Sequence, residues 1–289
     1  MNWDDMRVFL AVARAESLSG AAPSLKMDPA TVGRRIARLE EKVGAPLFVK
    51  SPQGYALTEQ GLRMRDHAAQ AETALNMAID EGQSADEGLS GQIRIGAPDG
   101  CANFVLPQVC AAIQRDNPGL EVQILSLPRV VNLSKREADL AVTVSAPDAG
   151  RLTVQKISDY HLHLATAENV TSLDRENLPP VVGYIPDMIF DKELDYLGDL
   201  DLNGVQLASN SAAVQLQMLR RGGVGIVHDF ALPFAPELRR IMVDEVSFTR
   251  SFYLVRHLAD RKSDRLNRFV EALLSGMKAE IARLESLAT

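Results

Sequence analysis

The sequence has no hydrophobic run that could cross a membrane, because no stretch approaches the roughly 18 consecutive apolar residues that a membrane helix needs. The first residues, MNWDDMRVFLAVARAES, carry acidic side chains where a secretory signal needs positive charge. We therefore expect a cytoplasmic protein that has no membrane among its partners.

Cysteine is scarce as well, since only Cys101 and Cys110 occur among the 289 residues. If both lie on one helix, their nine-residue separation places them about 13.5 Å apart along its axis. A disulfide needs Cα atoms within about 7 Å, so we predict two buried thiols. The alternative is a redox role for Cys101, which lies near a predicted helix start.

Catalytic and metal-binding motifs are also missing. The sequence contains no nucleophile elbow, no phosphate-binding loop and no complete set of zinc ligands. The histidines that suggest a metal site, with no accompanying cysteine or carboxylate pattern, are His161, His163, His228 and His257. We predict that the protein binds no metal, has no cofactor and is not an enzyme.

The net charge of −7 conceals an asymmetry. Residues 1–65 contain ten Lys and Arg against seven Asp and Glu, a charge of +3, which leaves −10 for the remainder. A basic N-terminal module on an acidic body is typical of a DNA-binding head attached to a body that avoids DNA.

Residues 18–61 predict a helix, a tight turn, a second helix and a short β-hairpin. Asp28 is a good N-cap for the second helix, Pro29 is a good first residue and Gly44 can end it. Its apolar residues, at spacings of four, three and four, are Val32, Ile36, Leu39 and Val43, and its cations are Arg34, Arg35, Arg38 and Lys42. Such a helix, entered through a tight turn, is suited to the major groove of DNA.

The flanking segments complete this module. A first helix over residues 3–16 should pack beneath the others, and Ser19 should cap the next helix, with Pro23 in its first turn. Residues 47–57 predict a two-stranded wing. We expect Lys50 and Gln53 near its tip to contact phosphate or the minor groove, the alternative being an ordinary surface hairpin.

Thr58 can cap a long helix that extends to about Asp86. Its small and apolar residues, which alternate spacings of three and four, are Gly61, Met64, Ala68, Ala71, Leu75, Ala78 and Gly82. This heptad seam predicts a dimerisation arm, and the alternative is a helix packed on its own domain. Residues 85–91 predict a hinge.

From Gln92 onward, strands alternate with helices, which predicts an α/β body with a mostly parallel sheet and helices on both faces. The predicted strands are 92–98, 120–127, 139–145, 152–158, 160–167, 181–185, 205–209, 224–230 and 251–257, with a break at Ser158–Asp159. The predicted helices are 102–118, 129–138, 210–223 and an amphipathic C-terminal helix over 263–286.

With these elements assigned, the whole chain resembles the LysR-type transcriptional regulators. The most specific match is residues 11–61, and further matches are LSGQIRIGAP, VLPQVCAAIQRDNPGLEVQIL, READLAV and SNSAAVQLQMLRRGGVGI. The resemblance implies a helix-rich N-terminal winged helix-turn-helix and a periplasmic-binding-protein-like effector domain of two α/β subdomains. It also implies double-stranded DNA and a small-molecule effector as partners, and a homodimer or homotetramer.

The implied boundaries are 1–60 for the DNA-binding domain, 61–88 for the linker helix and hinge, and 89–289 for the effector domain. Subdomain one would comprise about 92–158 plus 260–289, and subdomain two about 160–258. The chain would cross between them near Ser158–Tyr160 and near His257–Asp260, which makes a hinge.

Two departures from the family pattern affect DNA recognition. Asp28-Pro29-Ala30 stands where relatives commonly have Ser-Gln-Pro or Ser-Gln-Ser, so base reading should shift to Thr31, Arg34 and Arg35, with Arg38 as a further candidate. Gln53 occupies a wing position where an arginine is common in the family.

The resemblance places the effector between the subdomains, where two helix N-termini should meet. One helix follows Asp99, Gly100, Cys101 and Ala102, and the other follows Asn210 and Ser211. Such termini suit an anion such as a carboxylate, although Asp99 would repel one. Arg129 is a candidate counter-charge and His228 a candidate sensor of ligand or pH. The alternatives are that Asp99 and Asn210 only cap helices and that Arg129 and His228 have surface roles.

The leading hypothesis is therefore a DNA-binding regulator controlled by a small molecule. The alternatives are a constitutive DNA-binding protein with a ligand-free body and an enzyme on a binding-protein-like fold.

Overall fold

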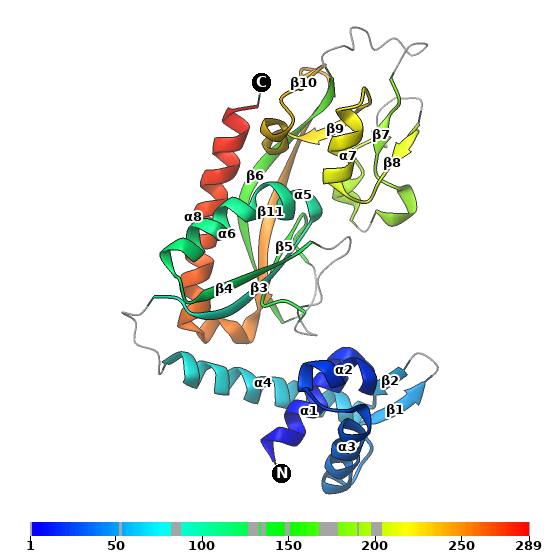
Figure 1. Ribbon diagram of the computed structural model, residues 1–289, viewed down its shortest axis with the longest axis vertical. Coiled ribbons are helices and arrows are strands. Elements are labelled where there is room, and N and C mark those ends of the chain that lie inside the picture. Colours follow the sequence, from blue (N-terminus) through cyan, green and yellow to red (C-terminus); the bar gives the residue numbers. More distant parts are fainter. Residues whose placement is uncertain are drawn as a thin grey trace. The chain divides into compact units, whose positions relative to one another are not determined.

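A computed structural model describes residues 2–51, 54–81, 88–126, 133, 137–147, 151–167, 179–189, 191–197 and 204–288. Gln53, Arg129 and most of the helix predicted over 129–138 lie outside the described residues, as does the side chain of Lys50. The chain forms two compact units, Met1–Ser84 and Ala85–Thr289, which Figure 1 shows in sequence colours.

The first unit begins with three helices, α1 (Trp3–Ala15), α2 (Leu18–Leu25) and α3 (Pro29–Val43). All three were expected, but the start of α2 was predicted wrongly. Ser17, not Ser19, caps it by accepting a hydrogen bond from the Gly20 N–H at 3.2 Å. Because α2 begins earlier than expected, Pro23 lies inside the helix and not in its first turn.

The predicted ends of α3 are confirmed. The Asp28 carboxylate accepts a hydrogen bond from the Thr31 N–H at 2.9 Å, and Pro29 is the first helical residue. Gly44 ends the helix with φ of +74°, a left-handed conformation that glycine adopts without steric cost. Val32 and Leu39 are fully buried beside Phe9 and Leu10 of α1, so packing against α1 determines which face of α3 remains outside.

The hairpin is present as β1 (Phe48–Ser51) and β2 (Gly54–Leu57), which pair antiparallel. The Glu40 carboxylate of α3 accepts the N–H groups of Leu47 at 2.7 Å and Phe48 at 3.1 Å. These two bonds attach the base of the wing to the end of α3, so the hairpin keeps a defined position relative to that helix.

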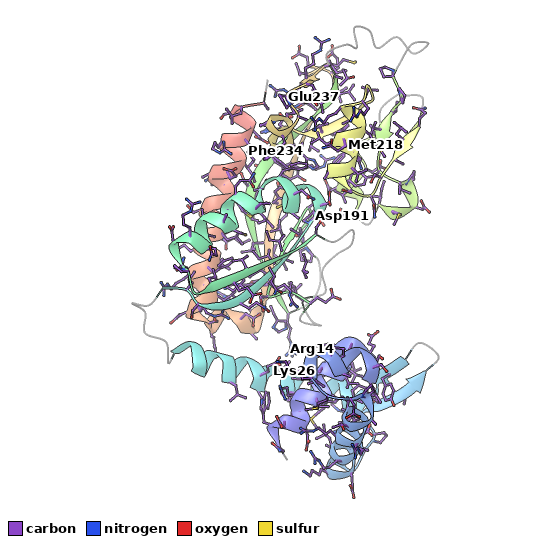
Figure 2. The ribbon with its side chains drawn as sticks, viewed as in Figure 1. Arg14, Lys26, Asp191, Met218, Phe234 and Glu237 are labelled. Atoms are coloured by element: carbon purple, nitrogen blue, oxygen red, sulfur yellow. The ribbon has the colours of Figure 1, made fainter. Side chains whose placement is uncertain are left out.

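Helix α4 (Glu59–Glu81) completes the first unit, and its predicted seam divides into two parts. Near its start, a Cβ on Gly61 would lie 2.1 Å from the Leu47 carbonyl oxygen, and Ala68 is 1% exposed. Arg14 of α1, labelled in Figure 2, forms an ion pair with Glu72. This half therefore packs on its own unit, whereas Leu75 further along is 47% exposed.

The second unit is built around one seven-stranded sheet in the order β10-β6-β11-β5-β3-β4, with β9 also paired to β6. Its strands are β3 (Gly91–Ala97), β4 (Leu120–Ser126), β5 (Leu140–Thr143), β6 (Leu152–Ala167), β9 (Val224–His228), β10 (Leu238–Arg240) and β11 (Ser247–His257). A separate parallel pair consists of β7 (Val182–Gly183) and β8 (Leu207–Ala208).

The expectation of a mostly parallel sheet was wrong. Only β3 pairs parallel in the large sheet, with β4 and β5, while β6 and β11 make antiparallel pairs throughout. The break at Ser158–Asp159 was also wrong, because β6 is one continuous strand. Its pairing with β11 shifts register between Phe252 and Tyr253, a bulge that locally twists and bends the two strands.

Two lobes result from this arrangement (Figure 1). The first contains β3, β4 and β5 with α5 (Asp99–Phe104) and α6 (Leu106–Asp116), and the second contains β7 to β10 with α7 (Ala212–Leu219). Strands β6 and β11 extend through both. The single helix predicted over 102–118 is broken at Val105, because Pro107 cannot donate a backbone hydrogen bond to the preceding turn.

Short 3-10 helices connect these elements: Pro186–Met188, Lys192–Leu194, Asp229–Phe234 and Leu258–Lys262. The predicted C-terminal helix is confirmed as α8 (Asp264–Ser286), whose buried residues include Phe269, Leu273 and Met277. Ser263 caps it by accepting the Leu266 N–H at 3.2 Å.

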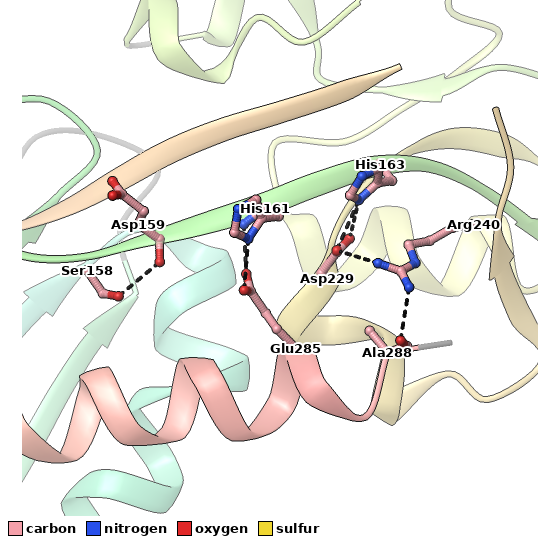
Figure 3. Close-up of polar contacts among 8 residues, drawn as sticks. All are labelled: Ser158, Asp159, His161, His163, Asp229, Arg240, Glu285 and Ala288. Carbon is pink, nitrogen blue, oxygen red and sulfur yellow. Dashed lines mark hydrogen bonds and ion pairs between the residues drawn. The ribbon is translucent and has the colours of Figure 1, made fainter. Parts of the chain in front are cut away.

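Side chains attach the end of α8 to β6, as Figure 3 shows. The Glu285 carboxylate accepts the backbone N–H of His161 at 2.7 Å and lies 2.9 Å from its Nδ1. Next along the strand, His163 Nδ1 lies 2.9 Å from the buried carboxylate of Asp229. Arg240 bonds to both Asp229 at 3.0 Å and the Ala288 carbonyl at 3.1 Å. The C-terminal helix is thereby held against the strand that joins the lobes.

Candidate functional site

The outer face of α3 is the first candidate site. Arg34 is exposed and donates a hydrogen bond to the Thr31 hydroxyl at 2.9 Å, so these two side chains lie together near the start of the helix. The N-terminal part of a recognition helix is the part that reaches base edges in helix-turn-helix proteins. Both residues were predicted from the sequence, and the structure brings them together.

The other cations of α3 are paired with acids of α1. Arg35 lies 3.2 Å from the Asp4 carboxylate, Arg38 bonds to Asp5, and Lys42 is 3.8 Å from Asp5. Asp5 is fully buried, and its hydrogen bond from Arg38 lowers the pKa of this carboxyl below its usual value. These pairs fix the rotation of α3 against α1.

This pairing separates the predicted DNA contacts into two classes. Within the described part of α3, Arg34 is the arginine that forms no ion pair with an acid of α1, and its guanidinium donors not bonded to Thr31 can reach a base. Arg35 and Arg38 must share their donors between α1 and any phosphate. Sequence reasoning missed this division, because Asp4 and Asp5 lie about 30 residues before their partners.

The second candidate site lies where α5 and α7 meet, one from each lobe. Asp99 is the first residue of α5, and its carboxylate accepts hydrogen bonds from the Ser211 hydroxyl at 2.9 Å and the Ala213 N–H at 3.1 Å, both at the start of α7. On its other oxygen it accepts from Asn103 and Ser126, each at 3.0 Å. The two helix N-termini expected in the cleft are thus together, with Asp99 between them.

A second link joins the lobes near this point. Ser145, just after β5, donates a hydrogen bond to the carboxylate of Asp191, which belongs to the opposite lobe and is labelled in Figure 2. Both links pair an acid with a serine hydroxyl, so neither needs a buried cation. The described lobes are held together through hydrogen bonds at two separate places.

His228 lies behind Asp99 in a cluster of aromatic rings and is 7% exposed. Its ring centroid is 4.8 Å from Phe230, 5.6 Å from Tyr160 and 6.1 Å from Tyr196. Burial lowers the pKa of His228 to about 4, with the charges of Asp229 and Asp99 opposing the shift. The ring is therefore neutral at physiological pH, and because it is buried, the alternative of a surface role for His228 is wrong.

Gly100 makes this packing possible. A Cβ at this position would lie 3.1 Å from the His228 ring, closer than nine in ten real contacts of this kind. Cys101 and Ala102 are buried just behind it, so these two predicted site residues contribute packing and present no polar group to a ligand. Asn210 is half-buried beside Ser211.

A cavity of about 150 Å³ adjoins the aromatic cluster in the second lobe. Its lining is mostly apolar and includes Tyr184, Ile189, Leu194, Tyr196, Val205 and Gln215. A cavity of this size accepts a small ring or a branched aliphatic group. Tyr184 and Tyr196 were not predicted as site residues, although both line this cavity, and a third tyrosine, Tyr160, lies in the adjoining aromatic cluster.

Both cysteines are buried and free. Cys101 and Cys110 lie on different helices, and burial raises the pKa of Cys110 to about 12 and that of Cys101 still further. A thiol with a raised pKa carries almost no thiolate at neutral pH, so neither residue has the reactivity of a redox sensor.

The described residues contain no group of three or more His, Cys, Asp and Glu side chains placed to hold a metal ion. None of the helices they form has the length and apolar character needed to span a bilayer.

Comparison with known proteins connects both sites to a family. Residues 3–62 match the family model described as "Bacterial regulatory helix-turn-helix protein, lysR family", and residues 86–278 match "LysR substrate binding domain". The transcriptional regulator DgdR of Burkholderia cepacia is 33% identical over 150 residues, which cover 51% of this chain and 50% of that protein. The chain thus spans about half the length of the curated relatives it matches.

Solved structures share the fold. Full-length OxyR C199D from Pseudomonas aeruginosa aligns with a TM-score of 0.65 at 15% identity, covering 96% of this chain and 94% of that one. Full-length LysG from Corynebacterium glutamicum with bound effector Arg aligns with a TM-score of 0.61 at 21% identity, covering 96% and 98%. Likeness at these identities supports the fold alone.

Proposed function

This chain belongs to the LysR family of transcriptional regulators, and we propose that it binds double-stranded DNA through α3 and the wing under the control of a small molecule. The observation that supports DNA binding is the hydrogen bond between Thr31 and the exposed Arg34 at the start of a recognition helix that α1 holds in place. The proposed role is regulatory and not enzymatic, and its place is the cytoplasm, where the DNA is.

We also propose that residues 1–60 form the DNA-binding domain, residues 61–88 the linker, and residues 89–289 the effector-binding domain. Base reading is assigned to Thr31 and Arg34, with Arg35, Arg38, Lys50 and Gln53 in supporting contacts to phosphate or the minor groove.

The effector is proposed to bind between the lobes, beside the Asp99 link and the aromatic cavity. LysG, a protein of the same fold, holds arginine as its effector, which supports a small molecule in this kind of body. The prediction that the effector is a carboxylate requires a binding position for an anion at the start of α7. An acid could bind there only by displacing the Asp99 carboxylate. Ligand control also requires that affinity differ between two arrangements of the lobes.

The test of effector control is thermal stability of the full-length protein against a library of carboxylates, amines and uncharged compounds. A ligand at 100 times its dissociation constant should add about 2.7 kcal/mol to the free energy of unfolding. The same compound should change affinity for operator DNA, since linkage is reciprocal. Intact operator binding with no stabilising compound would favour the constitutive alternative.

The exposed half of α4 provides a prediction about assembly. We propose that Ala71 and Leu75 pair with a second copy of the chain, so Leu75→Glu should place a charge in that seam and dissociate the oligomer at least tenfold more readily. Multi-angle light scattering measures the change. Leu62→Glu is the matched control, because Leu62 is 42% exposed on the same helix but off the seam.

Leu62→Glu should therefore keep the oligomeric state of the wild type. A Leu75→Glu variant with unchanged mass in solution and unchanged operator affinity would contradict the assignment of α4 as the arm.

A further inference from the structure

The Asp99 carboxylate accepts hydrogen bonds from groups of both lobes. One oxygen accepts from Asn103 and Ser126 in its own lobe, each at 3.0 Å. The other accepts from the Ser211 hydroxyl at 2.9 Å and the Ala213 N–H at 3.1 Å in the opposite lobe. A single side chain thus receives donors from both sides of the boundary between the lobes.

The start of α7 is a place where an anion from solution would otherwise bind, because its first N–H groups are unpaired within the helix and carry the positive end of the helix dipole. Here these donors are engaged. Ala213 donates to Asp99, and the next N–H, that of Val214, donates to the Ser211 hydroxyl at 3.3 Å. The carboxylate that completes this end of α7 belongs to the protein.

Resting on the function proposed above, we propose that Asp99 is a specificity-determining residue that acts as a built-in anion. It occupies the start of α7, links the two lobes, and excludes carboxylate effectors from that position. The effector of this regulator is accordingly an uncharged or cationic compound. The Asp99 carboxylate would repel the carboxylate of an effector within about 4 Å of it, and the hydrogen-bond donors at the start of α7 would already be engaged by Asp99.

Two independent features agree with this assignment. The Ser145–Asp191 hydrogen bond joins the same lobes, so a second contact between an acid and a serine hydroxyl supports the arrangement that Asp99 links. The cavity next to the link is lined mainly by apolar and aromatic side chains, and Asp195 is its acidic lining residue. Such a lining suits an uncharged or cationic group better than an acid.

The test replaces the built-in anion by one from solution. Asp99→Ala removes a carboxylate whose closest soluble equivalent is formate, so the full-length variant is titrated with sodium formate against sodium chloride at constant ionic strength. The melting temperature of the variant should fall by about 4 to 8 °C and should return toward the wild-type value as formate is added. Should the variant fold poorly, the yield of refolding in formate against chloride makes the same comparison.

Three proteins serve as controls: the wild type, Asp99→Asn and Asp116→Ala. Formate should stabilise none of them, because the wild type holds its own carboxylate, the amide of Asp99→Asn fills the space, and Asp116 is an exposed acid elsewhere. An Asp99→Ala variant as stable as the wild type, or one that is destabilised and indifferent to formate, would overturn the proposal. So would an acid that stabilises the wild type and Asp99→Ala equally.

These outcomes are independent of the proposed function. The stabilisation of the second unit by formate is measured without DNA. Failure of the wild type to select any DNA sequence would therefore refute the regulatory role and leave the formate result unchanged.

Discussion

Replacing Arg34 by alanine should weaken binding to the selected operator by about 1–3 kcal/mol per DNA-binding head while leaving random DNA almost unaffected. The reason is geometric. Among the described residues, Arg34 is the arginine of α3 that forms no ion pair with an acid of α1, and Thr31 already orients its guanidinium through a 2.9 Å hydrogen bond. In a dimer both heads lose the contact, so the observed loss approaches twice that of one head.

The measurement is fluorescence anisotropy on operator and scrambled DNA over a range of salt concentrations. A base contact should leave the salt dependence of binding almost unchanged, whereas loss of one phosphate contact lowers its slope by about one. Arg63→Ala is the matched control, since Arg63 is a 61% exposed arginine of the same unit whose partner is Glu59. Equal losses on operator and scrambled DNA for Arg34→Ala would show that the residue contacts phosphate only.

Acid should destabilise the second unit through His228. The folded protein holds the pKa of this ring at about 4, below its ordinary value of 6.5, because the ring is buried among aromatic side chains. The unfolded chain therefore binds the proton more readily. The contribution of His228 to the free energy of unfolding is fully present above about pH 6.5 and is lost as the pH falls toward 4. The total loss is about 3 kcal/mol.

Denaturant unfolding of the second unit from about pH 7 to about pH 4.5 measures the effect, with His228→Gln as the comparison. The variant has no ring to protonate, so its stability should fall less steeply over this range, whatever its absolute stability. His67→Gln, an exposed position in the first unit, should keep the wild-type slope. Identical slopes for His228→Gln and wild type would contradict the assignment.

The sequence predicted local structure well wherever one helix or one turn determined it. Asp28, Pro29 and Gly44 mark the ends of α3 because capping and left-handed geometry depend on the residue itself. The predicted C-terminal helix was found as α8, since buried residues recur at helical spacing over its whole length. Membership of the LysR family followed from the same residues.

Errors arose where partners lie far apart along the chain. Alternation of strands and helices indicates their order but not their direction, so the antiparallel return of β11 beside β6 was missed. The same limit applies to the sites. Asp99 was predicted to repel an anion, and its bonds to Ser211 and Ala213, over 100 residues away, are a fact of tertiary structure.

The tyrosines of the second lobe and the acids of α1 were missed for a related reason. Tyr184 and Tyr196 look like ordinary apolar positions in short segments, and their shared cavity forms only when β7, β9 and α7 meet. Asp4 and Asp5 look like favourable charges in the first turn of a helix, and their pairing with Arg35 and Arg38 depends on the packing of α1 on α3.

Selection of binding sites from random double-stranded DNA by the purified full-length protein tests the central claim most directly. The enriched sequences should contain two half-sites related by a two-fold axis at a fixed spacing, bound at least about 10³-fold more tightly than scrambled DNA at the same salt concentration. Enrichment of no common motif, with equal affinity for selected and scrambled DNA, would contradict the account of this chain as a sequence-specific regulator.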